Sequence, residues 1–141
     1  MLRAAWFPAT VAIIVVLWVF TRFGPRLEDP APVAMPAAVA DDEARELYLT
    51  PRGIYREPDI AANGHTTAAA KYRGFRARHD VEPQPGDAIC PITRTKASEA
   101  CTWIIDGKTY RFCCPPCIDE LVRTAREQPD GIQAPEAYLQ R

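Results

Sequence analysis

The apolar positions at the start of the chain form one continuous stretch. Residues 4–20 carry no charged side chain and are rich in Val, Ile, Leu, Trp and Phe. This stretch is at the short end of the range that spans a bilayer as a helix, about 17–25 residues. Trp6 and Trp18 lie near its ends, where interfacial aromatic rings are common. We therefore expect residues 1–23 to be a single-pass membrane anchor, with the C-terminal part outside the cytoplasm, in a periplasmic or other extracytoplasmic space.

A cleaved signal peptide is the alternative interpretation of the same stretch. Ala38-Val39-Ala40 has the small residues of a cleavage site. Signal peptides are cut within a few residues of their apolar segment, and this site lies much further along the chain. The distance favours an uncleaved anchor.

The hydrophobic pattern predicts less regular structure after the expected anchor. Residues 24–40 are rich in Pro and Ala and have few large side chains, which predicts an extended linker. Residues 41–85 are expected to be a partly helical middle region. Acidic residues at favourable N-terminal positions, Pro51 and the pair Asn63-Gly64 mark possible helix ends. They predict three short helices, at residues 41–49, 58–62 and 67–75.

Two stretches rich in β-branched and aromatic residues follow, at 101–105 and 108–113. Asp106-Gly107 between them is a preferred two-residue hairpin turn. Such a turn predicts three cross-strand pairs: Ile105 with Lys108, Trp103 with Tyr110, and Cys101 with Phe112. It also places four side chains on one face, which we expect to be the core: Trp103, Ile105, Tyr110 and Phe112.

A helix is predicted directly after the hairpin. Pro115 and Pro116 are tolerated in a first helical turn, apolar residues follow at helical spacing, and Pro129 ends the pattern. The expected fold class is α+β. Residues 86–141 are predicted to form a small treble-clef or zinc-ribbon-like module of hairpin plus helix.

Charge and motifs exclude several classes of function. The net charge is −1, and the one basic segment, residues 71–78, is short. Such a segment is more typical of a solvated face or a contact with anionic lipid than of a nucleic-acid site, so no nucleic-acid partner is expected. The sequence has no phosphate-binding loop and no recognisable nucleophile arrangement. We therefore do not expect an enzyme.

Five cysteines lie between positions 90 and 117, which predicts one compact site. Cys113 at the strand exit and Cys117 in the first helical turn can point to one position, and Cys90 can add a third sulfur from the preceding loop. The expected metal ligands are Cys90, Cys113 and Cys117, with Cys101 as the main candidate for a fourth. Other candidates for that position are Cys114, water, Asp87 and His79.

Disulfide bonds are the alternative use of these cysteines. In an oxidising compartment, bridges from Cys90 to Cys101 and from Cys113 to Cys117 can staple a small fold. A catalytic redox pair is less favoured, because three residues separate Cys113 from Cys117, whereas thioredoxin-type motifs have two.

Three segments of the module together resemble a known family. They are Asp87-Ala88-Ile89-Cys90-Pro91-Ile92, Gly107-Lys108-Thr109-Tyr110-Arg111-Phe112-Cys113, and Cys117. This arrangement is similar to the YHS and TRASH heavy-metal-binding domains, over roughly residues 86–125. Pro91-Ile92 replaces the Gly-Met that often follows the first cysteine of such domains, so a thioether ligand for copper is missing.

The resemblance implies binding of zinc or copper(I) by thiolates, for sensing, buffering or transfer of the ion near a membrane. The alternative is a structural zinc site or a disulfide-stapled module that presents a surface to a protein partner in a membrane assembly. The number of ligands separates the two, because a closed four-ligand site does not exchange its metal readily.

Overall fold

A computed structural model describes residue 36 and residues 38–141 of the chain. The predicted membrane anchor and nearly all of the predicted linker fall outside this range. None of the helices within the described range is long and apolar enough to cross a membrane. The described residues belong to one compact unit.

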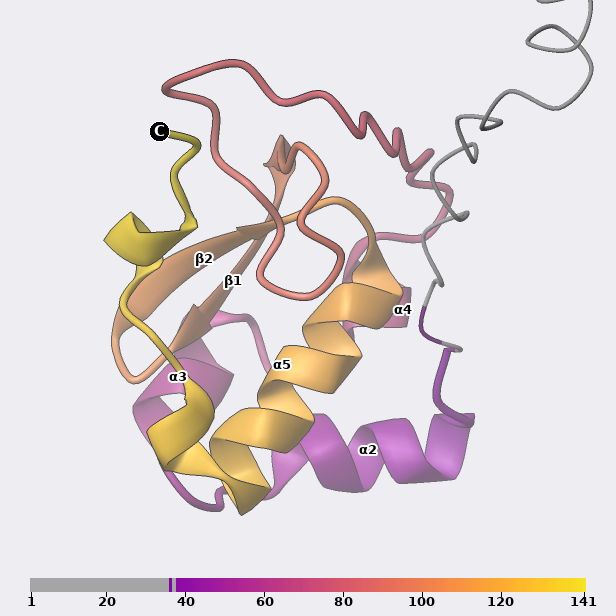
Figure 1. The fold of residues 1–141 in the computed structure, drawn as a ribbon. Coiled ribbons are helices and arrows are strands. Elements are labelled where there is room, and N and C mark those ends of the chain that lie inside the picture. The colour runs from indigo at the N-terminus through magenta and orange to yellow at the C-terminus, as the bar shows by residue number, and fades with distance from the viewer. Residues whose placement is uncertain (1–35, 37) are drawn as a thin grey trace, which may run out of the picture. The chain divides into compact units, whose positions relative to one another are not determined.

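The described part is a small α+β fold, as the sequence predicts, with a two-stranded antiparallel hairpin and several helices (Figure 1). Its elements, in order, are α2 (Asp41–Leu49), α3 (Glu57–Ala62), α4 (Ala68–Lys71), β1 (Ser98–Ile105), β2 (Lys108–Phe112), α5 (Pro115–Glu127), and the 3-10 helices η1 (Pro129–Gly131) and η2 (Pro135–Tyr138).

The predicted helices of the middle region differ in how well they match the structure. Helix α2 has the predicted bounds, and α3 begins one residue earlier than predicted. The third predicted helix, residues 67–75, is too long: α4 ends at Lys71. The chain turns there because Gly74 has a positive φ of 81° and the Tyr72 hydroxyl bonds to β1.

The hairpin has the predicted turn and most of the predicted register. Asp106 and Gly107 both have positive φ, 52° and 70°, as a type I′ turn requires. Ile105 pairs with Lys108 and Trp103 with Tyr110, as expected. The third predicted pair is wrong: Phe112 pairs with Ser98 instead of Cys101, because β1 bulges between Ser98 and Thr102.

The predicted apolar face of the hairpin is the core. Trp103, Ile105 and Phe112 are completely buried, and Tyr110 is 2% exposed. Helix α5 has the predicted start at Pro115 and stops before Pro129. It lies across the hairpin in Figure 1 and packs on both strands.

The middle region shares this core instead of standing apart from the hairpin. Tyr48 of α2 packs edge-to-face on Trp103, with ring centroids 5.0 Å apart. Tyr55 is completely buried, and its hydroxyl lies 3.3 Å from the indole nitrogen of Trp103, which donates to it. Residues 41–85 and 86–141 therefore bury their apolar side chains together.

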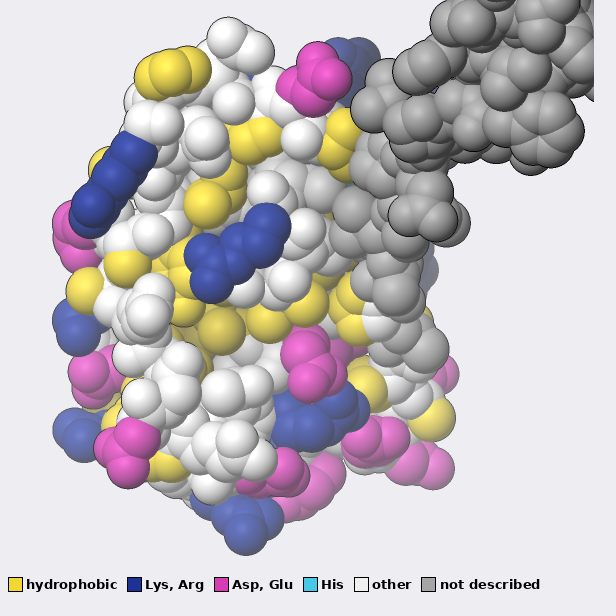
Figure 2. Space-filling model, viewed as in Figure 1, with side chains coloured by type: hydrophobic (Ala, Val, Ile, Leu, Met, Phe, Trp, Pro, Cys, Tyr) yellow, Lys and Arg dark blue, Asp and Glu magenta, His cyan; other side chains and the backbone are white. Residues whose placement is uncertain are grey.

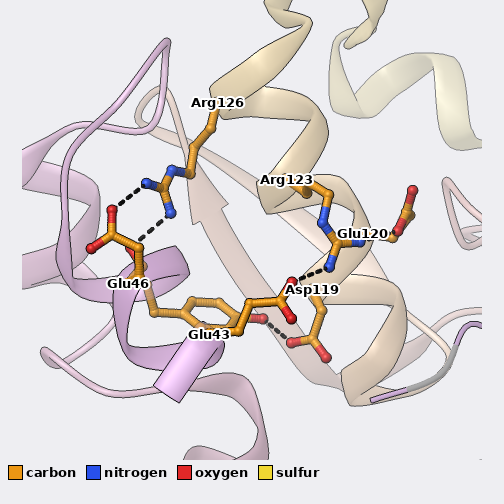
Figure 3. Close-up of polar contacts among 7 residues, drawn as sticks. Glu43, Glu46, Asp119, Glu120, Arg123 and Arg126 are labelled. Carbon is orange, nitrogen blue, oxygen red and sulfur yellow. Dashed lines mark hydrogen bonds and ion pairs between the residues drawn. The ribbon is translucent and has the colours of Figure 1, made fainter. Parts of the chain in front are cut away.

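Helices α2 and α5 are also joined by charged side chains. Acidic and basic side chains lie beside one another around α2 on the face drawn in Figure 2. Arg123 pairs with Glu43 at 2.9 Å, and Arg126 donates to the Glu46 backbone oxygen at 2.7 Å and to its carboxylate at 3.2 Å (Figure 3).

The outer edge of β1 is covered by side chains of the middle region. The Asn63 amide pairs with both backbone groups of Ile104, at 3.0 Å to its N–H and 2.8 Å to its carbonyl oxygen. The Tyr72 hydroxyl accepts from the Thr102 N–H at 2.9 Å and donates to the Thr102 carbonyl. An unpaired strand edge invites pairing with another chain, so this region closes the sheet on that side.

Candidate metal centre

Two candidate ligands come from the corner between β2 and α5. Cys113 follows the last residue of β2, and Cys117 is the third residue of α5. Cys114 is the N-cap, and Pro115 and Pro116 occupy the first helical turn, where their missing N–H groups are not needed. This corner brings the Cys113 and Cys117 sulfurs to 3.5 Å.

The third ligand comes from a tight loop before the hairpin. The Cys90 N–H donates to the Thr95 carbonyl at 2.8 Å, and Arg94, with a positive φ of 60°, donates its N–H to the Cys90 carbonyl at 3.0 Å. Ile89 and Lys96 form an antiparallel bridge at the base of this loop. Cys90 is thereby fixed beside the β2–α5 corner.

The three sulfurs form a group with the dimensions of a metal site. The Sγ atoms of Cys90, Cys113 and Cys117 all lie within 4.8 Å of one another. Two thiolates bound tetrahedrally to zinc at about 2.3 Å are themselves about 3.8 Å apart. Within the described residues this is the one group of three or more potential ligands with such spacing. The three soft, buried donors fit a thiophilic cation.

The surroundings of the three thiols are compatible with a bound cation. All three are buried, with exposures of 0–1%. The Thr93 hydroxyl lies 3.2 Å from the Cys113 sulfur and 2.9 Å from the Thr95 hydroxyl. A hydroxyl in this position can orient a ligand by donating to it.

Contacts between the sulfurs shift the pKa values of Cys114 and Cys117 in opposite directions. Hydrogen bonding from Cys113, then from Cys117, lowers the pKa of Cys114 to about 4. Bonds with Cys113 and Cys114 raise the pKa of Cys117, because a second thiol must ionise beside a thiolate. The contacting sulfurs of Cys113, Cys114 and Cys117 therefore differ in their affinity for a proton, and metal binding by thiolates would release protons.

Cys101, the main candidate for a fourth ligand, is completely buried but does not belong to this group. It lies on the buried face of β1 with Trp103 and Ile105. Burial, then the charges of Cys114, Cys113 and Cys90, raises its pKa to about 12. Cys101 is thus a neighbour of the group that stays a neutral thiol.

Cys114, a minor candidate ligand from the sequence, contacts two of the three grouped sulfurs. Its sulfur is 3.3 Å from that of Cys117 and 3.7 Å from that of Cys113. The signal was present in the sequence, since Cys114-Pro115-Pro116-Cys117 has the two-residue spacing of a dithiol motif. The sequence prediction rested on the Cys113 and Cys117 pair, in which three residues intervene.

The other candidates for a fourth ligand are engaged or exposed. Asp87 forms an ion pair with Lys96 at 2.8 Å, which lowers the pKa of Asp87. His79 is exposed. Neither belongs to the group of three sulfurs.

Comparisons with known proteins add no further constraint on the site. No family model matches the chain, and neither the curated proteins nor the solved structures that were compared contain a match.

Proposed function

We propose that this protein binds a thiophilic metal ion through the thiolates of Cys90, Cys113 and Cys117. One observation carries the proposal: three buried sulfurs, from a loop, a strand exit and a helix start, lie within 4.8 Å of one another. Burying a charged group without a partner is costly, and closely spaced thiolates repel one another unless a cation lies between them. The binding is proposed to be non-enzymatic.

Zinc and copper(I) are the ions that this donor set favours. Both bind thiolates, and three sulfurs leave zinc with a position for a further ligand while satisfying trigonal copper(I). The apolar Pro91-Ile92 beside Cys90 offers no thioether, which weakens the case for copper. Zinc is therefore the first ion to test.

The proposed fold type is a treble-clef-like module related to the YHS and TRASH domains. The loop with Cys90, the β1–β2 hairpin, and α5 with Cys117 in its first turn support this interpretation. The proposed role is sensing, buffering or transfer of the ion beside a membrane, to which residues 1–23 would anchor the chain.

Elemental analysis of matched cysteine variants tests the site. The full chain is purified under reducing conditions, loaded with zinc, and its zinc content is compared between wild type, Cys117→Ser and Cys101→Ser. Residues 117 and 101 are both completely buried, so the same substitution perturbs packing similarly at each. We expect one zinc ion in wild type and in Cys101→Ser, and none in Cys117→Ser.

Two results would reject the proposal. Wild-type chain that retains no zinc or copper(I) under reducing conditions would show that the sulfurs do not form a metal site. Equal loss of zinc from both variants would show that the group of three sulfurs is not the site.

A structural metal is the second candidate function, and the burial of the three cysteines favours it. In that case the metal holds the fold and a surface of the module meets a protein partner. The rate of zinc transfer to a chelator separates the two functions. Transfer much faster than global unfolding indicates an exchanging site, and transfer at the unfolding rate indicates a structural one.

A further inference from the structure

A second pair of sulfurs overlaps the proposed metal site. The sulfurs of Cys114 and Cys117 are 3.3 Å apart, the shortest of the three sulfur–sulfur separations among Cys113, Cys114 and Cys117. Cys117 belongs to the group of three proposed ligands, and Cys114 does not. One thiol is therefore shared between a metal site and a dithiol.

We infer that Cys114 and Cys117 form a disulfide by exchange with a low-molecular-weight disulfide, and that this bond withdraws Cys117 from the metal site and releases the ion. The inference rests on the proposed function for its second half only. Formation of the disulfide depends on the two sulfurs alone.

The position of the pair at the start of α5 suits this reaction. Cys114 is the N-cap residue, and Pro115 and Pro116 fix the backbone of the turn that separates it from Cys117. Residues three apart at a helix start have the spacing of thiol–disulfide exchange motifs. Cys114 is also the least buried of the five cysteines, at 4% exposed against 1% or less for the others.

The competing pairs are less well placed. Cys113 lies 3.5 Å from Cys117, but its sulfur is held by the Thr93 hydroxyl at 3.2 Å and belongs to the group with Cys90. The Cys113 and Cys114 sulfurs are 3.7 Å apart, the longest of the three separations. Cys114 is thus the natural partner of Cys117.

Glutathione disulfide is the oxidant of the two cysteine thiols. The Cys114 sulfur attacks one glutathione sulfur, the glutathione disulfide bond breaks, and one glutathione thiolate leaves. The Cys117 sulfur then attacks the Cys114 sulfur of this mixed disulfide, the bond between Cys114 and glutathione breaks, and the second glutathione leaves as thiolate. A Cys117 sulfur in this disulfide would no longer be available to hold the metal ion. Two electrons pass from the cysteine sulfurs to glutathione, which gains two protons from the protein thiols or from water.

Loss of one thiolate is enough to release the ion. Only Cys90 and Cys113 of the proposed ligands remain, whereas zinc sites in proteins use four protein ligands when structural and three when catalytic. Reduction by glutathione regenerates Cys117, so the same exchange in reverse restores the site.

Mass spectrometry of the full chain locates the bond directly. The metal-free chain is treated with glutathione disulfide, alkylated and cut with trypsin, which leaves all three cysteines on one fragment, residues 112–123. We expect alkylated Cys113 and a bond between Cys114 and Cys117. A bond that uses Cys113 would overturn the inference.

Zinc release tests the second half with Cys114→Ser as the variant. Serine is a favourable N-cap, so α5 keeps its start. We expect this variant to bind zinc as wild type does, and to release it to a chromogenic chelator roughly tenfold more slowly than wild type when glutathione disulfide is added. Cys101→Ser is the control, and its release should match wild type.

The outcomes separate the inference from the proposed function. Absence of zinc before any oxidant is added would reject the proposed function, while the disulfide map would still decide the pairing. Equal release rates from wild type and Cys114→Ser, or loss of zinc affinity in Cys114→Ser before oxidation, would overturn the inference.

Discussion

The carboxylate of Asp59 accepts a hydrogen bond of 2.8 Å from the backbone N–H of Gly107, at the tip of the hairpin and 48 residues further along the chain. The other oxygen of the same carboxylate accepts from the N–H of Asp106 and of Arg56, each at 3.0 Å. One buried side chain therefore caps α3 and holds the hairpin turn against it.

Removing the Asp59 carboxylate should destabilise the fold. Asp59→Ala leaves three backbone N–H groups without their acceptor, and we expect a loss of about 2–4 kcal/mol, since bonds to a charged group contribute about 1.5–3 kcal/mol each and are not additive. Asp59→Asn keeps one acceptor oxygen and should lose less. Urea unfolding at neutral pH measures both. The exposed Asp130→Ala is the control and should change stability by less than about 0.5 kcal/mol. A small effect of Asp59→Ala would mean that water replaces the carboxylate.

The edge of β1 should open when its side-chain partner is removed. Tyr72→Phe deletes the hydroxyl that meets both backbone groups of Thr102. We expect a loss of about 1–3 kcal/mol, together with faster hydrogen exchange at the Thr102 amide. Tyr138→Phe is the control, because the structure gives the Tyr138 hydroxyl no hydrogen bond within the described residues. Unchanged exchange at Thr102 in Tyr72→Phe would contradict this view of the strand edge.

Gly53 should not tolerate a side chain. A Cβ at this position would lie 2.3 Å from the Ala125 carbonyl oxygen, and φ is +61°. The left-handed conformation alone costs an L-residue roughly 1–2 kcal/mol, and here the carbonyl of α5 must also move. Gly74→Ala is a matched control, with a positive φ and no atom within 4 Å of the added Cβ. We expect Gly53→Ala to lower the melting temperature clearly more than Gly74→Ala, and equal shifts would show that the contact with α5 is not tight.

The buried pair of Tyr48 and Asp119 should give stability a distinct pH dependence. The Tyr48 hydroxyl donates to the Asp119 carboxylate, which joins α2 to α5. Figure 3 labels Asp119. Burial raises the pKa of Asp119 above its ordinary value of 3.8, although the bonds from Tyr48 and from the Val39 backbone oppose the shift. The native state then holds a proton on Asp119 more tightly than the unfolded state does. Its contribution is complete below pH 3.8 and is lost as the pH rises through the raised pKa.

Asp119→Asn removes this titration while keeping an acceptor for Tyr48. The stability of the variant relative to wild type should therefore increase as the pH rises from below 3.8 to neutral. Urea unfolding of both proteins at several pH values measures the difference, in which the other carboxyl groups cancel. Asp119→Ala should be less stable than Asp119→Asn by about 1–3 kcal/mol, because it leaves the Tyr48 hydroxyl unsatisfied. A pH-independent difference between wild type and Asp119→Asn would reject the raised pKa.

Local rules predicted the parts of the fold that lie close together in sequence. Asp106-Gly107 selects the type I′ turn, and the turn sets the pairing of Ile105 with Lys108. Pro115 starts α5 because a first-turn residue needs no N–H partner. Each of these outcomes depends on a few neighbouring residues, so no tertiary information was needed.

The errors arose where the structure depends on more than the neighbouring residues. The bulge in β1 moved Phe112 opposite Ser98, and the turn rule cannot detect a bulge several residues away from the turn. Helix α4 was predicted too long because the bond from Tyr72 to Thr102, thirty residues away, has no signal in the local pattern.

The candidate site also has a part that local sequence predicts and a part that depends on tertiary packing. The sequence by itself determined that Cys113 and Cys117 flank a helix start, since the distance between their sulfurs follows from one turn of backbone. The sequence also predicted Cys90 as the third member, and the structure brings its sulfur to the other two. Only the tertiary structure decided that Cys101 stays outside the group and that the middle region closes the edge of β1. These positions depend on how the loop, hairpin and helices pack around one shared core, and packing is a property of the whole chain.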